Sequence, residues 1–429
     1  MSWFHDGTAA LYRVEITTEL QASNAWKAAG AYLPTGQWMS VRLNVTNAPM
    51  RFYRVWADTS TAFRTRHAMV LVPGGVFAMG NTYGDPALVE GWPRELPVHD
   101  VPVSPFLMDK YEVSNEKAAE VFQWAYTNNL LGVNPIDAHP HAQVVNLEGV
   151  TQTLYRLDQT WSQIGFTNGA FYVKNNRTNF PIIGITWYGA QAYANYRSDM
   201  EGLPRAIGFA VTNWSMNLNA GGYRLPTEAE WEKACRGGIA GTHFPWPNDS
   251  VYGPSNYLYN IDVVKANYAD GRYQPWTNQP PHPWYFETIA TTPVGYYDGR
   301  QQIDFSVHPL TDWMSGADAG TTQDMANAYG LYDMGGNAWE WCWDWYATNW
   351  YSSPSASLPD PVGETNRANI DPPVVVRDLG AKILRGGGWY PVSLTFGSDP
   401  TYLRCAYREG QWPDVPMVSA GFRLARSIR

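Results

Sequence analysis

The feature of the sequence that most constrains its fold is a set of glycine-rich blocks in a fixed order. Residues 221–232 read GGYRLPTEAEWE, residues 330–341 read GLYDMGGNAWEW, and residues 384–389 read LRGGGW. A final Gly-Phe-Arg follows at 421–423. Glycine permits tight turns, whereas the large aromatic side chains beside it need a packed core. The blocks therefore favour a loop-rich domain in which aromatic packing holds irregular backbone in place.

Composition and charge agree with this interpretation and exclude some functions. The chain has 21 Trp, 27 Tyr, 38 Gly and 31 Pro, so we expect many turns and few long helices. The net charge is -9 and no cluster of Lys and Arg occurs, which argues against a nucleic-acid partner. No apolar run approaches the ~18 residues of a transmembrane segment, and the N-terminus lacks the pattern of a signal peptide.

Hydrophobic alternation predicts two parts of different character. Residues 1–58 contain three runs that alternate apolar and polar positions, as half-buried strands do, and we expect a small antiparallel β module there. These runs are 10–16, 39–45 and 51–56. The polar stretch 59–68 is expected to be a linker, and residues 69–429 are expected to form the main domain.

Capping signals predict three helices in the main domain. Ser114 or Asn115 is expected to cap a helix that runs to about Tyr126, and a second helix is expected to start near Thr186. The third starts at Thr227, which is followed three residues later by a glutamate in a capping-box arrangement.

Turn residues predict a hairpin and several surface loops. The Pro-Gly-Gly turn at 73–75 lies between two apolar runs and is typical of a β-hairpin. Four polar stretches rich in Pro, Asn, Ser or Asp are expected to be surface loops. They are 130–180, 270–290, 300–326 and 352–380.

Taken in order, the blocks resemble the formylglycine-generating enzyme family, whose sulfatase-modifying factor domain is a variant of the C-type lectin fold. The resemblance runs from about Met69 to Arg426. It implies an α+β, C-type-lectin-like domain with little regular secondary structure, preceded by the small antiparallel β unit. One difference concerns activity: the family's oxidases carry two cysteines just after the Arg-Gly-Gly block, and this chain has none there.

The missing cysteines argue against the family's oxidation chemistry. In the oxidases two thiolates capture copper(I), a soft metal that requires such ligands. Val392 and Phe396 stand near the corresponding positions, and neither can ligate copper or form a mixed disulfide with a substrate. We therefore expect no copper and no formylglycine-forming activity. Other branches of the family use an iron held by histidines in an added helical domain, but the eight histidines of this chain are scattered.

The three cysteines are Cys235, Cys342 and Cys405, and two interpretations of them stay open. All three can be buried thiols, or, as the resemblance implies, Cys235 and Cys405 can form a disulfide and leave Cys342 free. The disulfide would close a long loop and contribute about 4–5 kcal/mol in the chain-entropy model. It would also imply an oxidising compartment, and so an extracellular or cell-surface location.

The resemblance also implies structural calcium. Relatives bind one ion at the second block through residues that correspond to Asp333, Gly336, Ala338 and Glu340 here, as side-chain and backbone oxygen ligands. Calcium takes six to eight oxygen ligands, which a tight glycine-containing loop can supply. A second site in relatives has its counterpart at other positions. These are Asn267 and Tyr268, with Asp270 and Tyr273 as later candidates. The plain alternative is that the carboxylates of the second block only stabilise a turn.

The C-terminal segment is expected to be a binding surface. Family-type scaffold positions such as Arg404 and Arg423 alternate there with side chains suited to contact a ligand. The candidate binding residues are Trp389, Tyr390, Pro391, Val392, Leu394, Phe396, Tyr402, Tyr407, Glu409, Gln411, Trp412, Val415 and Met417. Aromatic side chains are common interface anchors, which favours binding over an ordinary exposed loop.

Two functions of different class remain open. The first is a non-catalytic protein that binds a protein, peptide or glycan through this surface. Its layout resembles the variable proteins of this fold that retroelements diversify, although residues 394–402 look inserted. The second is an oxidase related to formylglycine generation with an altered active site.

Overall fold

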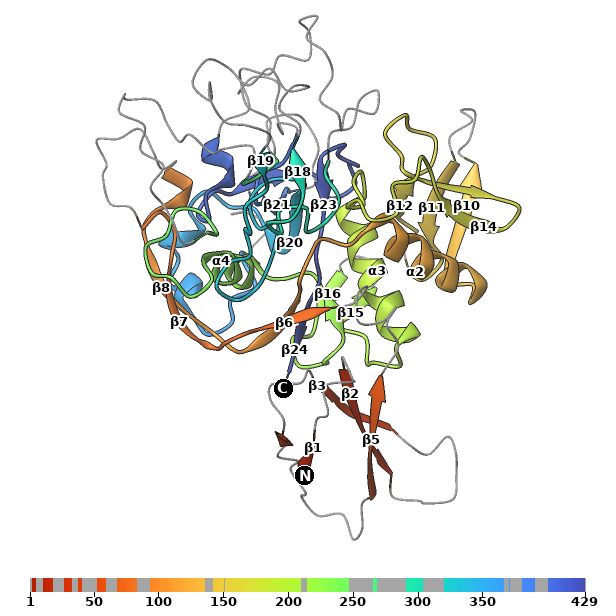
Figure 1. The fold of residues 1–429 in the computed structure, drawn as a ribbon, viewed down its shortest axis with the longest axis horizontal. Coiled ribbons are helices and arrows are strands. Elements are labelled where there is room, and N and C mark those ends of the chain that lie inside the picture. Colours follow the sequence, from red (N-terminus) through yellow and green to blue (C-terminus); the bar gives the residue numbers. More distant parts are fainter. Residues whose placement is uncertain are drawn as a thin grey trace, which may run out of the picture.

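The structure is a computed structural model that describes sixteen stretches of the chain. They are residues 2–4, 11–17, 27–32, 38–40, 52–58, 68–82, 93–135, 142–149, 151–209, 214–246, 265–267, 291–303, 320–365, 370, 380–389 and 400–428. Within them, short strands in many small sheets surround three α-helices, an α+β arrangement with little regular secondary structure (Figure 1). No helix in these stretches is long and apolar enough to span a lipid bilayer.

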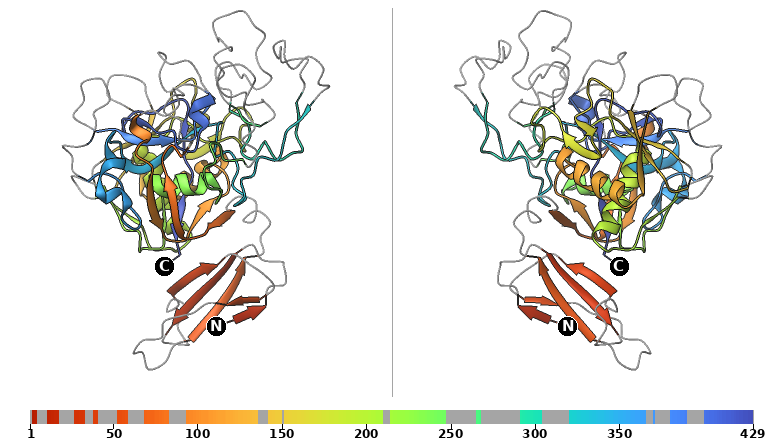
Figure 2. Two further views of the ribbon diagram at one scale, coloured as in Figure 1. Left: turned by 90° about the vertical axis from the view of Figure 1, so that its left-hand side faces the viewer. Right: turned by 90° about the vertical axis from the view of Figure 1, so that its right-hand side faces the viewer.

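Two small antiparallel sheets form the N-terminal part (Figure 2). The first pairs β1 (Ser2–Phe4) with β4 (Trp38–Ser40), and the second places β2 (Leu11–Thr17) between β3 (Lys27–Tyr32) and β5 (Phe52–Asp58). Two of the predicted runs become β2 and β5. Of the run 39–45, residues 39 and 40 lie in β4 and residues 41–45 lie outside the described residues. Strand β3 was not expected from the sequence.

The main domain contains two four-stranded sheets. The first has the antiparallel order β17-β24-β9-β6 and brings the first and last strands of the domain together. The second has the order β22-β21-β20-β23 and unites the second and third glycine-rich blocks. The strands of the first sheet are β17 (Tyr223–Arg224), β24 (Ala425–Ser427), β9 (Phe106–Asp109) and β6 (Met69–Val72). Those of the second are β22 (Glu409–Gln411), β21 (Lys382–Arg385), β20 (Trp339–Trp345) and β23 (Ala420–Gly421).

The expected hairpin at 73–75 is wrong. Strand β6 pairs with β9, whereas β7 (Gly75–Met79) pairs with β8 (His99–Val103), so the turn passes the chain from one sheet to another. A Cβ on Gly74 would lie 2.7 Å from Pro105 Cδ, because the turn packs directly against the loop before β9.

The stretch 130–180 is also more ordered than the expected loop. It contains the sheet β10-β11-β12 and the hairpin β13-β14. Two further two-stranded antiparallel sheets, β15-β16 and β18-β19, lie elsewhere in the domain. The bounds are β10 (Leu131–Pro135), β11 (Ala142–Asn146), β12 (Thr153–Arg156), β13 (Ile164–Thr167), β14 (Ala170–Val173), β15 (Ile207–Phe209), β16 (Trp214–Met216), β18 (Gln302–Ile303) and β19 (Gly320–Thr321).

Side-chain caps begin all three helices where the sequence predicts. Helix α2 (Asn115–Thr127) is capped by Ser114 and α3 (Trp187–Met200) by Thr186. Helix α4 (Glu228–Arg236) begins with the complete capping box of Thr227 and Glu230. Helices α2 and α3 pack against each other, as Figure 1 shows. Short 3-10 helices complete the domain: η1 (Pro93–Glu95), η2 (Trp350–Ser352), η3 (Pro354–Ser357) and η5 (Pro400–Leu403).

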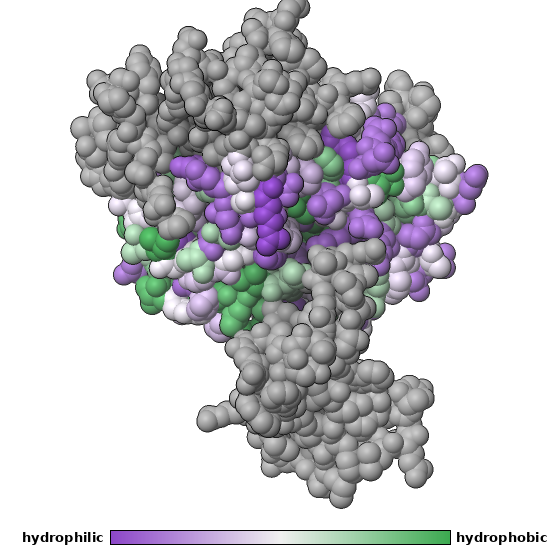
Figure 3. Space-filling model, in the orientation of Figure 1, coloured by the Kyte–Doolittle hydropathy of each residue, from purple (hydrophilic) through white to green (hydrophobic). Residues whose placement is uncertain are grey.

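Aromatic side chains fill the core, as the composition predicts. One cluster joins α2 and α3 to Trp339 and Trp341 of β20, and a second surrounds Trp231 of α4. Several buried arginines lie among these rings and pair with acids, such as Arg197 with Asp109 at 3.0 Å. On the outside, hydrophobic and hydrophilic side chains of the described residues are interspersed on the face in Figure 3.

Candidate functional site

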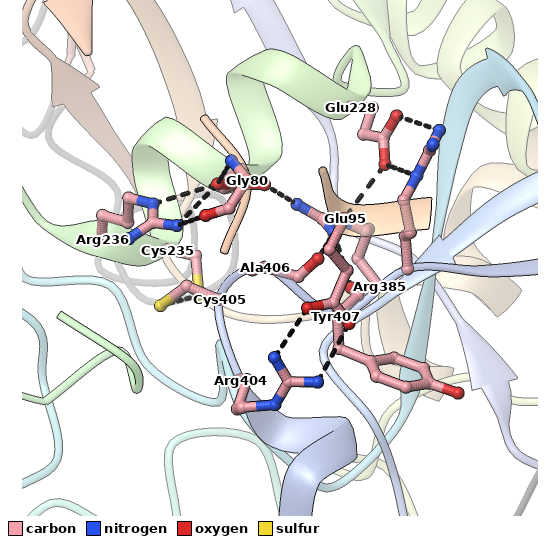
Figure 4. Close-up of polar contacts among 12 residues, drawn as sticks. Gly80, Glu95, Glu228, Cys235, Arg236, Arg385, Arg404, Cys405, Ala406 and Tyr407 are labelled. Carbon is pink, nitrogen blue, oxygen red and sulfur yellow. Dashed lines mark hydrogen bonds and ion pairs between the residues drawn. The ribbon is translucent and has the colours of Figure 1, made fainter. Parts of the chain in front are cut away.

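Buried ion pairs fix the C-terminal segment to the domain (Figure 4). Arg404 donates to both carboxylate oxygens of Glu95, at 2.7 and 2.9 Å, and Arg408 donates to both oxygens of Glu228, at 2.8 and 2.7 Å. These side chains are at most 3% exposed. Because removal of one partner strands a buried charge, such pairs hold the backbone firmly.

The glycine-rich blocks meet through two side chains, Arg385 and Glu340. Arg385 of the third block donates to the carbonyls of Ala406 and Tyr407, at 2.9 and 2.6 Å, and forms an ion pair with Glu232 of the first block (Figure 4). Glu340 of the second block accepts from Trp231 Nε1 at 2.7 Å and from Arg423 at 2.7 to 2.9 Å. The blocks thus form one frame around the C-terminal segment.

The structure brings only some of the predicted binding residues to the surface. Tyr402, Glu409, Gln411, Trp412 and Val415 are half-buried. The expectation of exposure is wrong for others, because Tyr407, Trp389 and Met417 are only 2, 6 and 9% exposed. Tyr407 packs on Tyr402 and Trp339, and so belongs to the frame. The candidates Tyr390, Pro391, Val392, Leu394 and Phe396 lie outside the described residues.

Sequence reasoning missed Arg94, which organises the half-buried surface. Its guanidinium lies over the Tyr407 ring and donates to the Glu409 carboxylate at 3.1 and 3.3 Å and to the Tyr407 hydroxyl at 2.7 Å. Burial and the Glu409 carboxylate raise the pKa of Tyr407, so its hydroxyl keeps its proton and donates to Glu409 at 3.0 Å. No local signal marks Arg94, because it lies far from Glu409 in the sequence.

A cluster of buried carboxyl groups surrounds the second block. Asp333 and Glu340 are joined there by Glu112, which sequence reasoning also missed and which is 0% exposed. Burial, and then the charge of Asp333, raises the pKa of Glu112 well above its usual range. Burial likewise raises the pKa of Asp333 to about 6, although the Gly295 N–H donates to its carboxylate. Facing carboxyl groups of this kind share either a proton or a cation.

The loop around this cluster is tightly curled. Asp333, Gly336 and Asn337 have φ values of 56, 99 and 61°. A Cβ on Gly336 would lie 2.6 Å from the Asn267 carbonyl oxygen, which also accepts from the Asn337 N–H at 2.7 Å. Asn267, predicted for a second ion, therefore lies against the first predicted site. Tyr268, Asp270 and Tyr273 are outside the described residues.

The predicted calcium ligands are not equally suited to bind a cation. Asp333 and the curled backbone offer oxygen atoms of the type that calcium prefers. Glu340 is already held by Arg423 and Trp231, so it fits better as their partner. Within the described residues, no three His, Cys, Asp or Glu side chains are arranged to hold a metal ion by themselves. Any calcium here would depend on backbone carbonyls such as those of Gly336 and Ala338.

The three cysteines are buried. The sulfur atoms of Cys235 and Cys405 lie 3.1 Å apart, side by side in Figure 4. Both are free thiols in the structure, as is Cys342. Burial raises the pKa of Cys235, with a further contribution from the neighbouring Cys405, and burial raises that of Cys342.

The sequence matches the model of a known protein family. A model of the sulfatase-modifying factor enzyme 1-like domain matches residues 56–428. The chain belongs to this family. The match begins inside β5, before the expected domain start at 69.

Relatives within the sulfatase-modifying factor family differ in length. The chain is 28% identical over 373 residues to the formylglycine-generating enzyme of Streptomyces coelicolor, covering 84% of this chain and 90% of that protein. It is 26% identical over 360 residues to a protein of Chlamydia pneumoniae described as serine/threonine-protein kinase pkn1, and spans only 38% of its length. Among solved structures, Treponema denticola variable protein 1 has a TM-score of 0.42 at 20% identity, over 84% of this chain and 94% of that chain.

Proposed function

We propose that the protein is a non-catalytic ligand-binding protein that displays a C-terminal binding surface on a C-type-lectin-like scaffold. The main support is a contrast between buried and half-buried residues in the C-terminal segment. Residues 404–423 are anchored by buried arginines, yet Glu409, Gln411, Trp412 and Val415 between the anchors remain half-buried. A fixed backbone that presents an aromatic side chain binds with little loss of conformational freedom.

The chemistry of the cysteines supports binding over oxidation. A thiolate, rather than a thiol, acts as a nucleophile or as a copper ligand. The raised pKa values of Cys235 and Cys342 keep these thiols protonated, and no cysteine occurs between residues 384 and 404. An oxidase of the formylglycine-generating type would need a different set of reacting groups.

We further propose one structural calcium ion at the curled loop, with Asp333 and the carbonyls of Gly336 and Ala338 as ligands. The ion would neutralise the buried Asp333 and Glu112 carboxylates and rigidify the second block. The facing sulfurs of Cys235 and Cys405 support the proposal that they form a disulfide outside the cytoplasm, in an extracellular or cell-surface protein.

We also propose that the C-terminal surface varies between natural copies of the protein, as in targets of diversity-generating retroelements. The support is the alternation of buried anchors with half-buried side chains in residues 404–423. A near-copy of the coding region for 384–423 beside a reverse transcriptase gene would agree with this proposal. Identical coding regions across many isolates would contradict it.

The binding function is tested with displayed random peptides, a glycan array and one pair of variants. Trp412→Ala is expected to weaken binding of the selected ligand by about 2 kcal/mol or more, because central aromatic anchors dominate interfaces. Its unfolding free energy should hardly change. The control Tyr172→Ala removes a side chain that is 45% exposed on β14, away from this segment, and should bind normally. Conversion of a cysteine-containing sulfatase peptide to formylglycine by the purified protein would refute the proposal.

A further inference from the structure

Strand β22 lies at the edge of the sheet that carries the binding surface. In the described part of the chain it pairs only with β21, in the register Leu384 with Glu409 and Lys382 with Gln411. All three of its residues are half-buried. An edge strand of this kind has a second side along which another extended segment can pair.

The N–H group of Gly410 in β22 and that of Trp412, the residue after β22, are each capped by the side chain of the preceding residue. The Gly410 N–H donates to Glu409 Oε1 at 3.0 Å, and the Trp412 N–H donates to Gln411 Oε1 at 2.8 Å. Alternate residues of a strand direct their backbone groups to the same edge. Since both donors bond to side chains and not to β21, residues 410 and 412 direct their N–H groups away from the sheet.

The two capping side chains, Glu409 and Gln411, differ in the other hydrogen bonds that they accept. Glu409 is also bound by Arg94 and by the Tyr407 hydroxyl, so its carboxylate stays paired if Gly410 takes another acceptor. Gln411 uses its amide oxygen for Trp412 alone in the described part of the chain. Both caps can therefore be displaced without leaving a buried charge unpaired.

We propose that β22 binds an extended peptide segment of a partner protein by strand addition, with Trp412 as the adjacent side-chain anchor. This inference rests on the proposed binding function and names its class of ligand. Carbonyl oxygens at alternate positions of the peptide replace Glu409 Oε1 and Gln411 Oε1. In an extended peptide every second residue faces the same side, so its carbonyl groups match two N–H donors that are two residues apart. Edge strands that recognise a peptide by its main chain use this match.

The shape of β22 suits a flat approach by another backbone. Gly410 passes directly over Tyr346, where a Cβ would lie 2.9 Å from the ring. The strand therefore carries no side chain at its centre, and the partner is recognised by its main chain there and by its side chains near Trp412. A glycan offers no regular row of carbonyl acceptors at this spacing, which favours the peptide.

The test begins with random 12-residue peptides displayed on phage and selected on the purified full chain, with a glycan array in parallel. Each selected peptide is resynthesised with one N-methyl amide at a time. Strand addition predicts losses of at least tenfold in affinity at alternate positions only, because only one edge of the peptide pairs. It also predicts at least tenfold slower hydrogen exchange of the Gly410 and Trp412 amides in the complex.

A matched pair of variants tests the caps. Gln411→Met keeps the side-chain length but removes the competing oxygen, and should raise peptide affinity about threefold or more. The control Gln123→Met removes an oxygen that caps the Phe171 N–H elsewhere, at 2.8 Å, and should leave affinity unchanged. Peptides whose losses show no alternation, or ligands found only among glycans, would overturn strand addition. The binding function would survive either result provided that Trp412→Ala weakens the interaction.

Discussion

Replacing Arg404 with methionine is expected to lower the unfolding free energy by about 3–5 kcal/mol, the usual cost of removing one partner from a buried ion pair. Arg404 is 2% exposed and Glu95 0% exposed, and their two hydrogen bonds are 2.7 and 2.9 Å long. Methionine fills much of the same space, so the loss comes chiefly from the stranded Glu95 carboxylate.

Arg205 provides the matched control. It pairs with Asp199 and Glu148, but these side chains are 24 to 30% exposed. Arg205→Met should therefore cost less than about 1 kcal/mol. Both variants are measured by urea unfolding, followed by tryptophan fluorescence. The double variant Arg404→Met, Glu95→Leu should recover most of the loss, because neither charge remains. Equal losses in the two single variants would refute the reasoning from burial.

Three further predictions concern calcium, pH and the cysteines. Chelation of calcium with EGTA should lower the melting temperature of the wild type but not that of Asp333→Asn. If the melting temperature of the wild type does not change, Asp333 only stabilises a turn. Burial, and then the charge of Glu228, raises the pKa of Asp344 to about 8, above the ~3.9 of an unfolded aspartate. The protonated Asp344 therefore contributes to the free energy of unfolding in full below about pH 4, and this contribution is lost as the pH rises through 8. Urea unfolding between pH 5 and 9 should show that the unfolding free energy depends less on pH in Asp344→Asn than in the wild type. Protein from an oxidising compartment should yield a linked Cys235–Cys405 peptide by mass spectrometry without reduction; two singly alkylated cysteines would contradict the disulfide.

Local sequence was a good guide wherever structure depends on neighbouring residues. Thr227 and Glu230 cap α4 as predicted, because a capping box needs only residues three positions apart. The turn at 73–75 was misjudged for the opposite reason. A Pro-Gly-Gly turn marks a change of direction, but whether the two strands pair depends on β8 and β9, which are distant in sequence.

Prediction from local sequence also failed for part of the binding surface. The sequence marked Tyr407 and Met417 as candidate contacts, and both are buried. Aromatic and apolar side chains suit an interface and a core equally well, so residue type alone does not separate these roles. Burial is decided by the residues that pack on them, and for Tyr407 these are Trp339 and Tyr402.

By itself, the sequence determined the family, the α+β fold, the helix starts and the lack of a cysteine pair after the third block, because these depend on ordered motifs and on local hydrogen bonding. Only the tertiary structure placed Arg94 on Glu409 and joined Glu112 to Asp333. It alone also left β22, among the described strands, at the edge of its sheet, with the Gly410 and Trp412 N–H groups capped by side chains. These contacts join residues from separate parts of the chain, or depend on which strands pair. Folding alone decides them, because burial and long-range pairing arise only once the core has formed.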